Sequence, residues 1–282
     1  FLKYETSRTS NALAILRKEK LISPGAAIGC TGGGAFRFSK EFQQQLHHEG
    51  WHKVDEMHSL VTGVSFLIQN VPKSIYTFKL RQEEGTPERL FLDVGAADRY
   101  PRLIVNVGSG VSVLLMETAD EYKRVGGSSL GGGTFLGLAK LIAGPVSFDE
   151  ALALARKGDS TKVDLLVGDI YGGHYSDLGL PEDAIAAFFG KMLQQNTTAD
   201  EMRRENLMAA LLKLVTYSIA TTAFLYSRIY HPEHIVFTGN FLTGNVEAEA
   251  RIAYMVAKRS QGQVLPLFMA RGGYFGAMGA LL

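Results

Sequence analysis

The sequence holds a single cysteine, Cys30, so the chain cannot form an internal disulfide bond. A disulfide-stabilised extracellular scaffold is thereby excluded, and a reducing compartment fits the composition. An excess of charge of one sign is also missing, because 29 Lys and Arg residues stand against 28 Asp and Glu residues. With a net charge of +1, the composition gives no sign of a polyanion-binding surface, and we expect no nucleic-acid partner.

The third feature that the sequence lacks is a long uninterrupted hydrophobic run. The best candidate, from Leu214 to Tyr226, spans 13 residues and is broken by Thr and Ser. A membrane span needs about 20 apolar residues. Residues 1–20 are charged and polar, so we expect neither a signal peptide nor a membrane span. We therefore expect a cytoplasmic protein, with mitochondrial or nuclear forms also compatible. Since the chain begins with Phe1 and not with Met, we expect a fragment or a processed form.

The 282 residues, 46% of them hydrophobic, are enough for about two domains. Short apolar runs alternate with amphipathic stretches, a pattern typical of α/β architecture. The predicted strands cover 26–30, 52–56, 103–107, 111–117, 122–125, 235–238 and 263–268. The predicted helices cover 10–20, 35–47, 59–69, 131–142, 149–156, 184–191, 201–230, 247–258 and 274–282. A polar, irregular stretch at 81–99 indicates a boundary between a first domain at 1–99 and a second at 100–282.

Glycine is abundant, with 31 residues, and it gathers where predicted strands end. These glycine turns lie at 31–34, 108–110, 126–133 and 238–240. A helix N-terminus offers unsatisfied N–H groups to a phosphate, and glycine lets the backbone approach it. Four such turns in two α/β units predict a nucleotide-binding cleft. The predicted phosphate-binding residues are Gly131, Gly132, Gly133 and Gly239.

Two common nucleotide motifs do not fit these turns. The turn Gly108-Ser109-Gly110 joins two β-rich runs, whereas a dinucleotide fingerprint leads from a strand into a helix. The sequence Gly190-Lys191-Met192 lacks the Ser or Thr that a Walker A loop requires. The turn at 108–110 is therefore interpreted as a hairpin whose backbone amides can cradle an anion or a hydroxyl group.

Adjacent acids, Asp55 and Glu56, stand where a predicted strand passes into a helix. A carboxylate in that place can deprotonate an alcohol, but acids before a helix also commonly serve only as N-caps. No metal site is predicted, because the histidines near Trp51 lack a ligand spacing with acids or thiols. They are His47, His48, His52 and His58.

Arg124 is the cation best placed to serve the 108–110 turn. It stands on a strand next to the one that holds Ser112, within reach of the pocket that Ser109 and Ser112 would line. The alternative is a surface arginine that pairs with Asp120 or Glu121.

Longer motifs follow one another along nearly the whole chain. They are Cys30-Thr-Gly-Gly-Gly-Ala-Phe-Arg-Phe38, Val105-Asn-Val-Gly-Ser-Gly-Val-Ser112, Tyr122-Lys-Arg-Val-Gly-Gly-Ser-Ser-Leu-Gly-Gly-Gly-Thr134, Arg156-Lys-Gly-Asp-Ser-Thr-Lys-Val-Asp164, Asp169-Ile-Tyr-Gly-Gly173, Val236-Phe-Thr-Gly-Asn-Phe-Leu242 and Gly273-Tyr-Phe-Gly-Ala-Met-Gly-Ala280. In these motifs the sequence resembles the eukaryotic-type (type II) pantothenate kinases. The resemblance implies the actin/hexokinase/Hsp70-like (ASKHA) fold, an α/β fold with two RNase H-like lobes.

The resemblance also implies a reaction and its residues. The reaction is ATP-dependent phosphorylation of pantothenate at the 4′-hydroxyl, the first step of coenzyme A biosynthesis, with Mg²⁺ bound through the nucleotide. Glu56, in Val54-Asp-Glu-Met57, matches the family's general base. Ser109, Ser112 and Arg124 match the residues that hold pantothenate and the feedback inhibitor acetyl-CoA. Such kinases are homodimers, and we expect the helix at 201–230 to contribute to the interface.

One departure from the family pattern stands out. The first phosphate loop of the family, Asp-Ile-Gly-Gly-Thr, does not occur, so we expect the first lobe to lack its opening β-hairpin in this chain. A catalytically inactive branch of the family has lost the glutamate and the arginine, whereas Glu56 and Arg124 are both present here. Two alternatives stay open: a non-catalytic acyl-CoA-binding regulatory subunit, and another small-molecule kinase or ATPase of the same fold.

Overall fold

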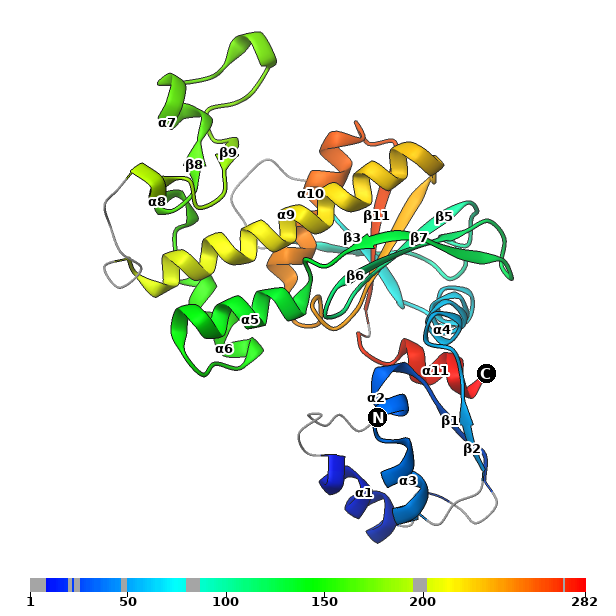
Figure 1. Ribbon diagram of the computed structural model, residues 1–282. Coiled ribbons are helices and arrows are strands. Elements are labelled where there is room, and N and C mark those ends of the chain that lie inside the picture. Colours follow the sequence, from blue (N-terminus) through cyan, green and yellow to red (C-terminus); the bar gives the residue numbers. More distant parts are fainter. Residues whose placement is uncertain are drawn as a thin grey trace. The chain divides into compact units, whose positions relative to one another are not determined.

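The computed structural model describes residues 9–19, 22, 26–46, 50–79, 87–194, 202–270 and 272–282. His47, His48 and residue 201, with which the helix predicted at 201–230 begins, lie outside the described residues. The chain folds into two compact units (Figure 1). Unit 1 comprises Phe1–Ile75, Phe91–Arg99 and Met269–Leu282, and unit 2 comprises Tyr76–Leu90 and Tyr100–Phe268.

This division differs from two consecutive domains at 1–99 and 100–282. The segment after residue 268 belongs to unit 1, because it ends in helix α11 (Phe275–Leu281), which packs against α4 (Glu56–Asn70). The segment 76–90 belongs to unit 2, because it supplies most of two strands of the sheet of that unit. The chain passes from one unit to the other four times, so a single boundary in the sequence cannot describe the division.

Unit 2 is built on a mixed seven-stranded sheet in the order β4-β3-β11-β10-β5-β6-β7. These strands are β3 (Ile75–Phe78), β4 (Arg89–Phe91), β5 (Arg102–Val107), β6 (Val111–Met116), β7 (Tyr122–Ser128), β10 (His234–Thr238) and β11 (Leu265–Met269). β6 runs antiparallel to both β5 and β7, whereas β10 runs parallel to both β5 and β11. The mixed α/β architecture confirms the prediction from the alternating pattern.

Helices α9 (Arg204–Tyr230) and α10 (Val246–Arg259) pack against one face of this sheet. Tyr226 of α9 lies against Gly126 of β7, and the Tyr76 hydroxyl of β3 reaches α10. The strand side chains on this face are apolar and fully buried, as Val105 and Val113 illustrate. Shorter helices complete unit 2: α5 (Gly132–Ala143), α6 (Phe148–Arg156), α7 (Val167–Tyr171) and α8 (Lys191–Gln194).

Within the described part of the chain, α9 is the one helix that is long and apolar enough to cross a membrane by length and composition. It contains the apolar run 214–226 but extends over 27 residues. Of its most apolar window, 56% is buried inside the protein, as in the core helix of a folded domain. Its contacts with α5, α6, α10 and the sheet account for its apolar character.

The helix predicted at 184–191 is wrong. Ile185–Ala187 forms strand β9, which pairs with β8 (Leu165–Leu166). Phe189 has a positive φ of 57°, a left-handed conformation that a continuing helix does not allow. The Phe189 amide donates to the carboxylate of Asp164 over 3.1 Å, which holds the chain in this turn. The predicted helix at 35–47 is likewise split into α2 (Gly32–Arg37) and α3 (Ser39–Leu46).

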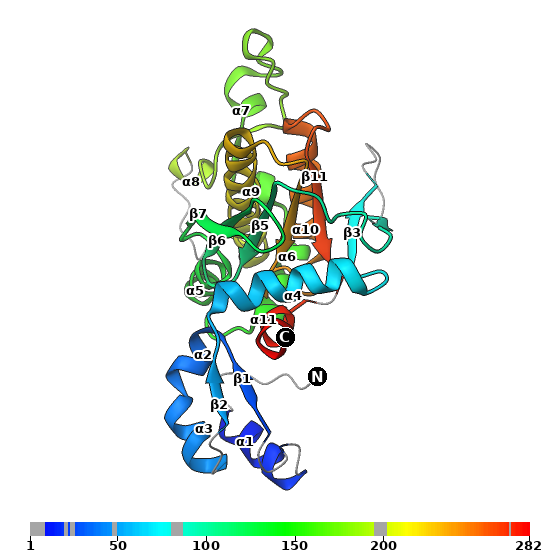
Figure 2. The ribbon, with the colours of Figure 1, turned by 90° about the vertical axis from the view of Figure 1, so that its right-hand side faces the viewer.

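Unit 1 contains a parallel strand pair, β1 (Ile28–Cys30) and β2 (Trp51–Lys53), with α1 (Thr9–Lys18), α2, α3 and the α4–α11 pair. Figures 1 and 2 both show α4 and α11 side by side. Glycines allow this approach: a Cβ at Gly63 would lie 2.0 Å from the Phe275 carbonyl oxygen, and one at Gly279 would lie 1.8 Å from that of Ser59. The two helices thus meet backbone to backbone.

We predict that Gly279→Ala destabilises the protein by about 1–3 kcal/mol, because the added methyl group forces the helices apart. The matched control is Gly137→Ala in α5, where a Cβ would meet nothing within 4 Å. That variant should be more stable by about 0.5–1 kcal/mol, since alanine favours helix more than glycine does. Thermal and urea unfolding measure both. Equal stability of Gly279→Ala and wild type would contradict the close helix contact.

Candidate functional site

The N-terminus of α5 is hydrogen-bonded to the turn Gly108–Gly110 at the end of β5. The amide of Gly132 donates to the Gly108 carbonyl over 2.8 Å, and the amide of Gly133 donates to the Ser109 carbonyl over 2.9 Å. Two of the amides predicted to bind phosphate are therefore engaged within the protein. Phosphate binding by this segment stays a prediction, and its observed role is to hold the turn.

Only glycine allows this contact. A Cβ at Gly131 would lie 2.7 Å from the backbone of Gly110, and one at Gly132 would lie 2.9 Å from the Gly108 carbonyl oxygen. Such distances are well below van der Waals contact, so any side chain would push the helix away from the turn. The glycine run thus has a packing role that is independent of any ligand.

A β-bulge in β7 decides where Arg124 points. Ser112 pairs with Gly127 and Leu114 pairs with Arg124, so one residue, Val125, is left over between the two pairs. In a regular strand, residues three apart face opposite sides; the extra residue brings Arg124 and Gly127 to the same face as Ser112. The Arg124 Nη2 atom lies 3.1 Å from the position that a Cβ would take at Gly127. The bulge thereby places a guanidinium group beside Ser112.

Arg124 does not pair with the acids considered above. Among the described residues, neither Asp120 nor Glu121 forms an ion pair with it, and the nearby Glu117 binds Lys123 over 2.8 Å. The side chain is exposed. Its guanidinium group is thus available for an anionic ligand.

Gly239 follows β10 directly and lies against the end of β5. Its φ of 112° is rare for residues with a side chain, and a Cβ would lie 2.3 Å from the Val107 carbonyl oxygen. The structure therefore gathers six predicted site residues of unit 2 at one end of the sheet, together with Ser109 in the turn. They are Ser112, Arg124, Gly131, Gly132, Gly133 and Gly239.

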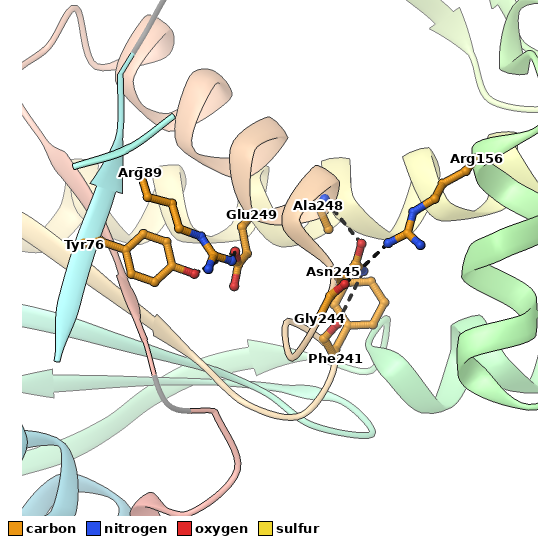
Figure 3. A network of polar contacts seen from close by, with 8 residues as sticks. All are labelled: Tyr76, Arg89, Arg156, Phe241, Gly244, Asn245, Ala248 and Glu249. Carbon is orange, nitrogen blue, oxygen red and sulfur yellow. Dashed lines mark hydrogen bonds and ion pairs between the residues drawn. The ribbon is translucent and has the colours of Figure 1, made fainter. Parts of the chain in front are cut away.

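The loop after Gly239 is held by contacts that the sequence analysis missed (Figure 3). Asn245 caps α10 by accepting from the Ala248 amide over 3.4 Å, and its Nδ2 donates to the Phe241 carbonyl over 3.3 Å. Arg156 donates to the Gly244 carbonyl over 3.4 Å. The sequence signal was an asparagine just before a helical pattern, a common N-cap. These bonds fix the loop that carries Gly239.

A buried charged group lies in the first turn of α10 (Figure 3). Glu249, 4% exposed, accepts from the Tyr76 hydroxyl over 2.7 Å and from Arg89 over 3.0 Å. The Arg89 guanidinium stacks on the Tyr76 ring at 4.4 Å. Burial raises the pKa of Glu249, while Tyr76 and Arg89 act in the opposite direction. This cluster ties β3 and β4 to α10 and has a structural role.

Glu56 belongs to unit 1, and the structure separates its role from that of Asp55. Asp55 is the N-cap of α4, since its carboxylate accepts from the His58 amide over 2.8 Å. Glu56 is the first residue of the helix, and its Oε2 lies 3.9 Å from the Cβ position of Gly32 in the 31–34 turn. The capping alternative therefore holds for Asp55, while the exposed carboxylate of Glu56 faces a glycine turn.

Cys30 precedes the same turn. Burial raises the pKa of its thiol to about 11, so it is protonated near neutral pH and a poor nucleophile. In the described part of the chain, no three His, Cys, Asp or Glu side chains come together in a way that could hold a metal ion.

Comparison with known proteins gives matches over the whole chain. The family model described as Fumble matches residues 1–282. The chain is 36% identical over 292 residues to "Pantothenate kinase 1" of Arabidopsis thaliana, and this match covers 99% of the chain and 74% of that protein. It is 35% identical over 297 residues to "Pantothenate kinase 2" of the same plant, of which it spans 32%. It is 36% identical over 283 residues to "4'-phosphopantetheine phosphatase" of Mus musculus, of which it spans 33%.

We predict that Gly131→Ala destabilises unit 2 by about 1–3 kcal/mol, because its methyl group meets the backbone of Gly110. Gly108→Ala, in the 108–110 turn that Gly131 contacts, is the matched control, since a Cβ there would meet nothing within 4 Å. Urea unfolding followed by circular dichroism compares the two variants. Equal losses in both would show that close packing is not the reason for glycine at 131.

Proposed function

This chain belongs to the Fumble family, and from that membership we propose that it transfers the γ-phosphate of ATP to the 4′-hydroxyl of pantothenate. The observation that carries the proposal is the placement of Arg124 and Ser112 on one sheet face beside the glycine turns. The mixed α/β sheet with glycine turns at its strand ends supports the two-lobed ASKHA kinase fold. Because the chain spans about a third of two of the relatives compared, the activity of the whole protein is part of the proposal.

Arg124, Ser109 and Ser112 are the proposed acceptor-binding residues. Pantothenate carries a carboxylate, which suits an exposed guanidinium without an ion pair among the described residues. The serine hydroxyls suit the hydroxyl and amide groups of the same molecule. Acetyl-CoA contains the pantothenate moiety, so the same residues would bind it as a feedback inhibitor.

MgATP is the proposed second substrate, and Gly239 and the start of α5 are its proposed phosphate-binding segment. The fit rests on backbone that no side chain covers, since a Cβ at Gly239 would collide with Val107. Gly132 and Gly133 already donate to the 108–110 turn. In this arrangement they support the phosphate site by keeping the turn in place.

Glu56 is the proposed general base. It takes the proton from the 4′-hydroxyl as that oxygen forms a bond to the γ-phosphorus, and the bond between the γ-phosphorus and the β–γ bridging oxygen breaks to release ADP. Asp55 is occupied as the N-cap of α4, which leaves Glu56 as the carboxylate free of a capping role. General base catalysis of this kind contributes about 10²–10⁴-fold to a rate.

Because the mouse relative is named as a phosphatase, phosphatase activity is a second candidate function. The acyl-CoA-binding subunit without turnover, and a kinase for another small molecule, also remain alternatives. An assay of the full-length protein with labelled ATP and a panel of acceptors separates them. Phosphate transfer to pantothenate supports the proposal; transfer only to other acceptors such as N-acetylglucosamine, or acyl-CoA binding without transfer, would overturn it.

We predict that Glu56→Gln lowers kcat for pantothenate phosphorylation by about 10²-fold or more, because the amide cannot accept the proton. The matched control is Asp55→Asn, since asparagine caps a helix as well as aspartate does. It should keep kcat within about threefold of wild type and the same melting temperature.

Two results would contradict this assignment, and each points to a different conclusion. If Glu56→Gln keeps near-normal turnover while wild-type protein is active, the assignment of the base is wrong, although the kinase activity stands. If Asp55→Asn loses the activity instead, the base is the other acid of the pair.

We further propose a homodimer in which α9 contributes to the interface. Leu225 and Ile229, one turn apart on α9, are 55% and 61% exposed. Light scattering at micromolar concentration should give twice the mass of one chain. The double variant Leu225→Lys, Ile229→Lys should be monomeric, whereas Leu141→Lys, at a leucine of α5 that is 82% exposed, should stay dimeric. A monomeric wild type would contradict the proposal.

A further inference from the structure

Three polar side chains cross the sheet of unit 2 at a single level. Thr238 of β10 is paired directly with Asn106 of β5, and Asn106 is paired with Ser112 of β6. Residues paired across neighbouring strands point to the same face of a sheet. Thr238, Asn106 and Ser112 therefore form a row on the face opposite to α9 and α10, which we call the polar row.

The polar row differs sharply from its neighbours on the same face. On β10, β5 and β6 the next level of paired residues consists of Val236, Ile104 and Leu114, which are apolar and fully buried, and only on β7 does that level hold a charged residue, the exposed Arg124. The polar row is the last level before the glycine turns at 108–110 and 239. The change from apolar to polar thus occurs where the proposed phosphate-binding backbone begins.

Thr238 provides an independent sign of a ligand. Its side chain is 2% exposed, and its hydroxyl has no hydrogen-bond partner in the part of the chain that the structure describes. Burying a hydroxyl without a partner costs about 1–3 kcal/mol, a penalty that valine, of the same shape, would avoid. Buried polar groups are normally satisfied, and Thr238 directly precedes the glycine turn at 239, so a ligand at that turn would supply the missing bond.

The two ends of the polar row belong to the two substrates of the proposed reaction. Ser112 lies beside Arg124 at the acceptor end, and Thr238 precedes Gly239 at the nucleotide end. With strands about 4.8 Å apart, Ser112 and Thr238 are about 10 Å apart across the sheet, with Asn106 between them. The middle of the row therefore lies between the proposed positions of the nucleotide and the acceptor.

We infer that the Thr238 hydroxyl and the Asn106 carboxamide donate hydrogen bonds to the phosphoryl group in transfer. The inference rests on the proposed function. In the step, the acceptor oxygen gains a bond to the γ-phosphorus and gives its proton to Glu56, while the bond to the β–γ bridging oxygen breaks and ADP leaves. Charge is spread over the three equatorial oxygens of the phosphoryl group, which neutral O–H and N–H donors stabilise without a proton transfer.

The decisive variant is Thr238→Val in the full-length protein, with Thr238→Ser to restore the hydroxyl. We expect Thr238→Val to lower kcat about 10–100-fold, a smaller decrease than the one that follows removal of a full oxyanion-hole donor. Its melting temperature should equal or exceed that of wild type, because an unsatisfied buried hydroxyl is gone. Thr238→Ser should recover kcat to within about threefold. Asn106→Ala should lower kcat in the same way and leave the KM for pantothenate unchanged.

Thr216→Val is the matched control. Thr216 is a second fully buried threonine of unit 2 whose hydroxyl has no partner among the described residues, but it lies on α9, away from the polar row. It should leave kcat unchanged. A structural role for Thr238, such as binding a buried water, would instead lower the melting temperature of Thr238→Val with no change in kcat, and that result would overturn the inference.

A binding measurement separates this inference from the proposed function. The dissociation constant of Mg²⁺ with a non-hydrolysable ATP analogue is measured by calorimetry for wild type, Thr238→Val and Thr216→Val. We expect it to rise about fivefold or more in Thr238→Val only. If wild type phosphorylates pantothenate but Thr238→Val matches it in kcat and nucleotide affinity, the inference alone fails. If wild type does not phosphorylate pantothenate yet Thr238→Val still weakens nucleotide binding, the proposed function fails and the phosphate contact stands.

Discussion

The contact on which the site of unit 2 depends is a backbone contact between α5 and the 108–110 turn. Its hydrogen bonds, from Gly132 to Gly108 and from Gly133 to Ser109, join two segments that are more than twenty residues apart. A Cβ at Gly131 or Gly132 would overlap the turn, so these two positions require glycine whatever the site binds. Ser109, at the tip of the turn, thereby acquires a fixed place relative to β10 and Gly239. An arrangement built on backbone in this way depends on packing before it depends on any charge.

The elements with a strong periodic pattern could be predicted from the sequence. The apolar run at 103–107 corresponds to β5, and the long helical pattern up to Tyr230 corresponds to α9. Both elements are largely buried, so the spacing of their apolar residues is enough to predict them. The error at 184–191 has an identifiable cause. The alanines of this segment favour helix, but the left-handed conformation of Phe189 and its hydrogen bond to Asp164 override that preference. Strand β3 was overlooked although Ile75–Phe78 is β-branched and aromatic, since its place is set by pairing within the sheet.

The sequence could nominate candidate site residues but not their geometry. Gly239 stands out as a glycine directly after a strand, and Arg124 stands out as a cation on a strand next to the one that holds Ser112. The side to which Arg124 points depends on one unpaired residue, Val125, and a bulge of this kind leaves no mark in the hydrophobic pattern. The sequence likewise does not reveal that the Gly132 and Gly133 amides are hydrogen-bonded within the protein, because their acceptors lie in a distant turn. Nonlocal contacts also explain why the C-terminal segment joins unit 1, where α11 meets α4 through Gly63 and Gly279.

Unit 2 departs from ordinary folding rules at one end of its sheet in two ways. A bulge interrupts β7, and Thr238 buries a hydroxyl without a partner among the described residues. The buried hydroxyl costs stability that a valine of the same shape would not. Packing explains the glycines at 131 and 132, but it gives no reason for a polar side chain at 238 when Val236, one level away on the same strand face, is apolar and fully buried. Ligand binding gives a reason, because a hydroxyl donor that costs stability in the free protein is a group that an anion requires.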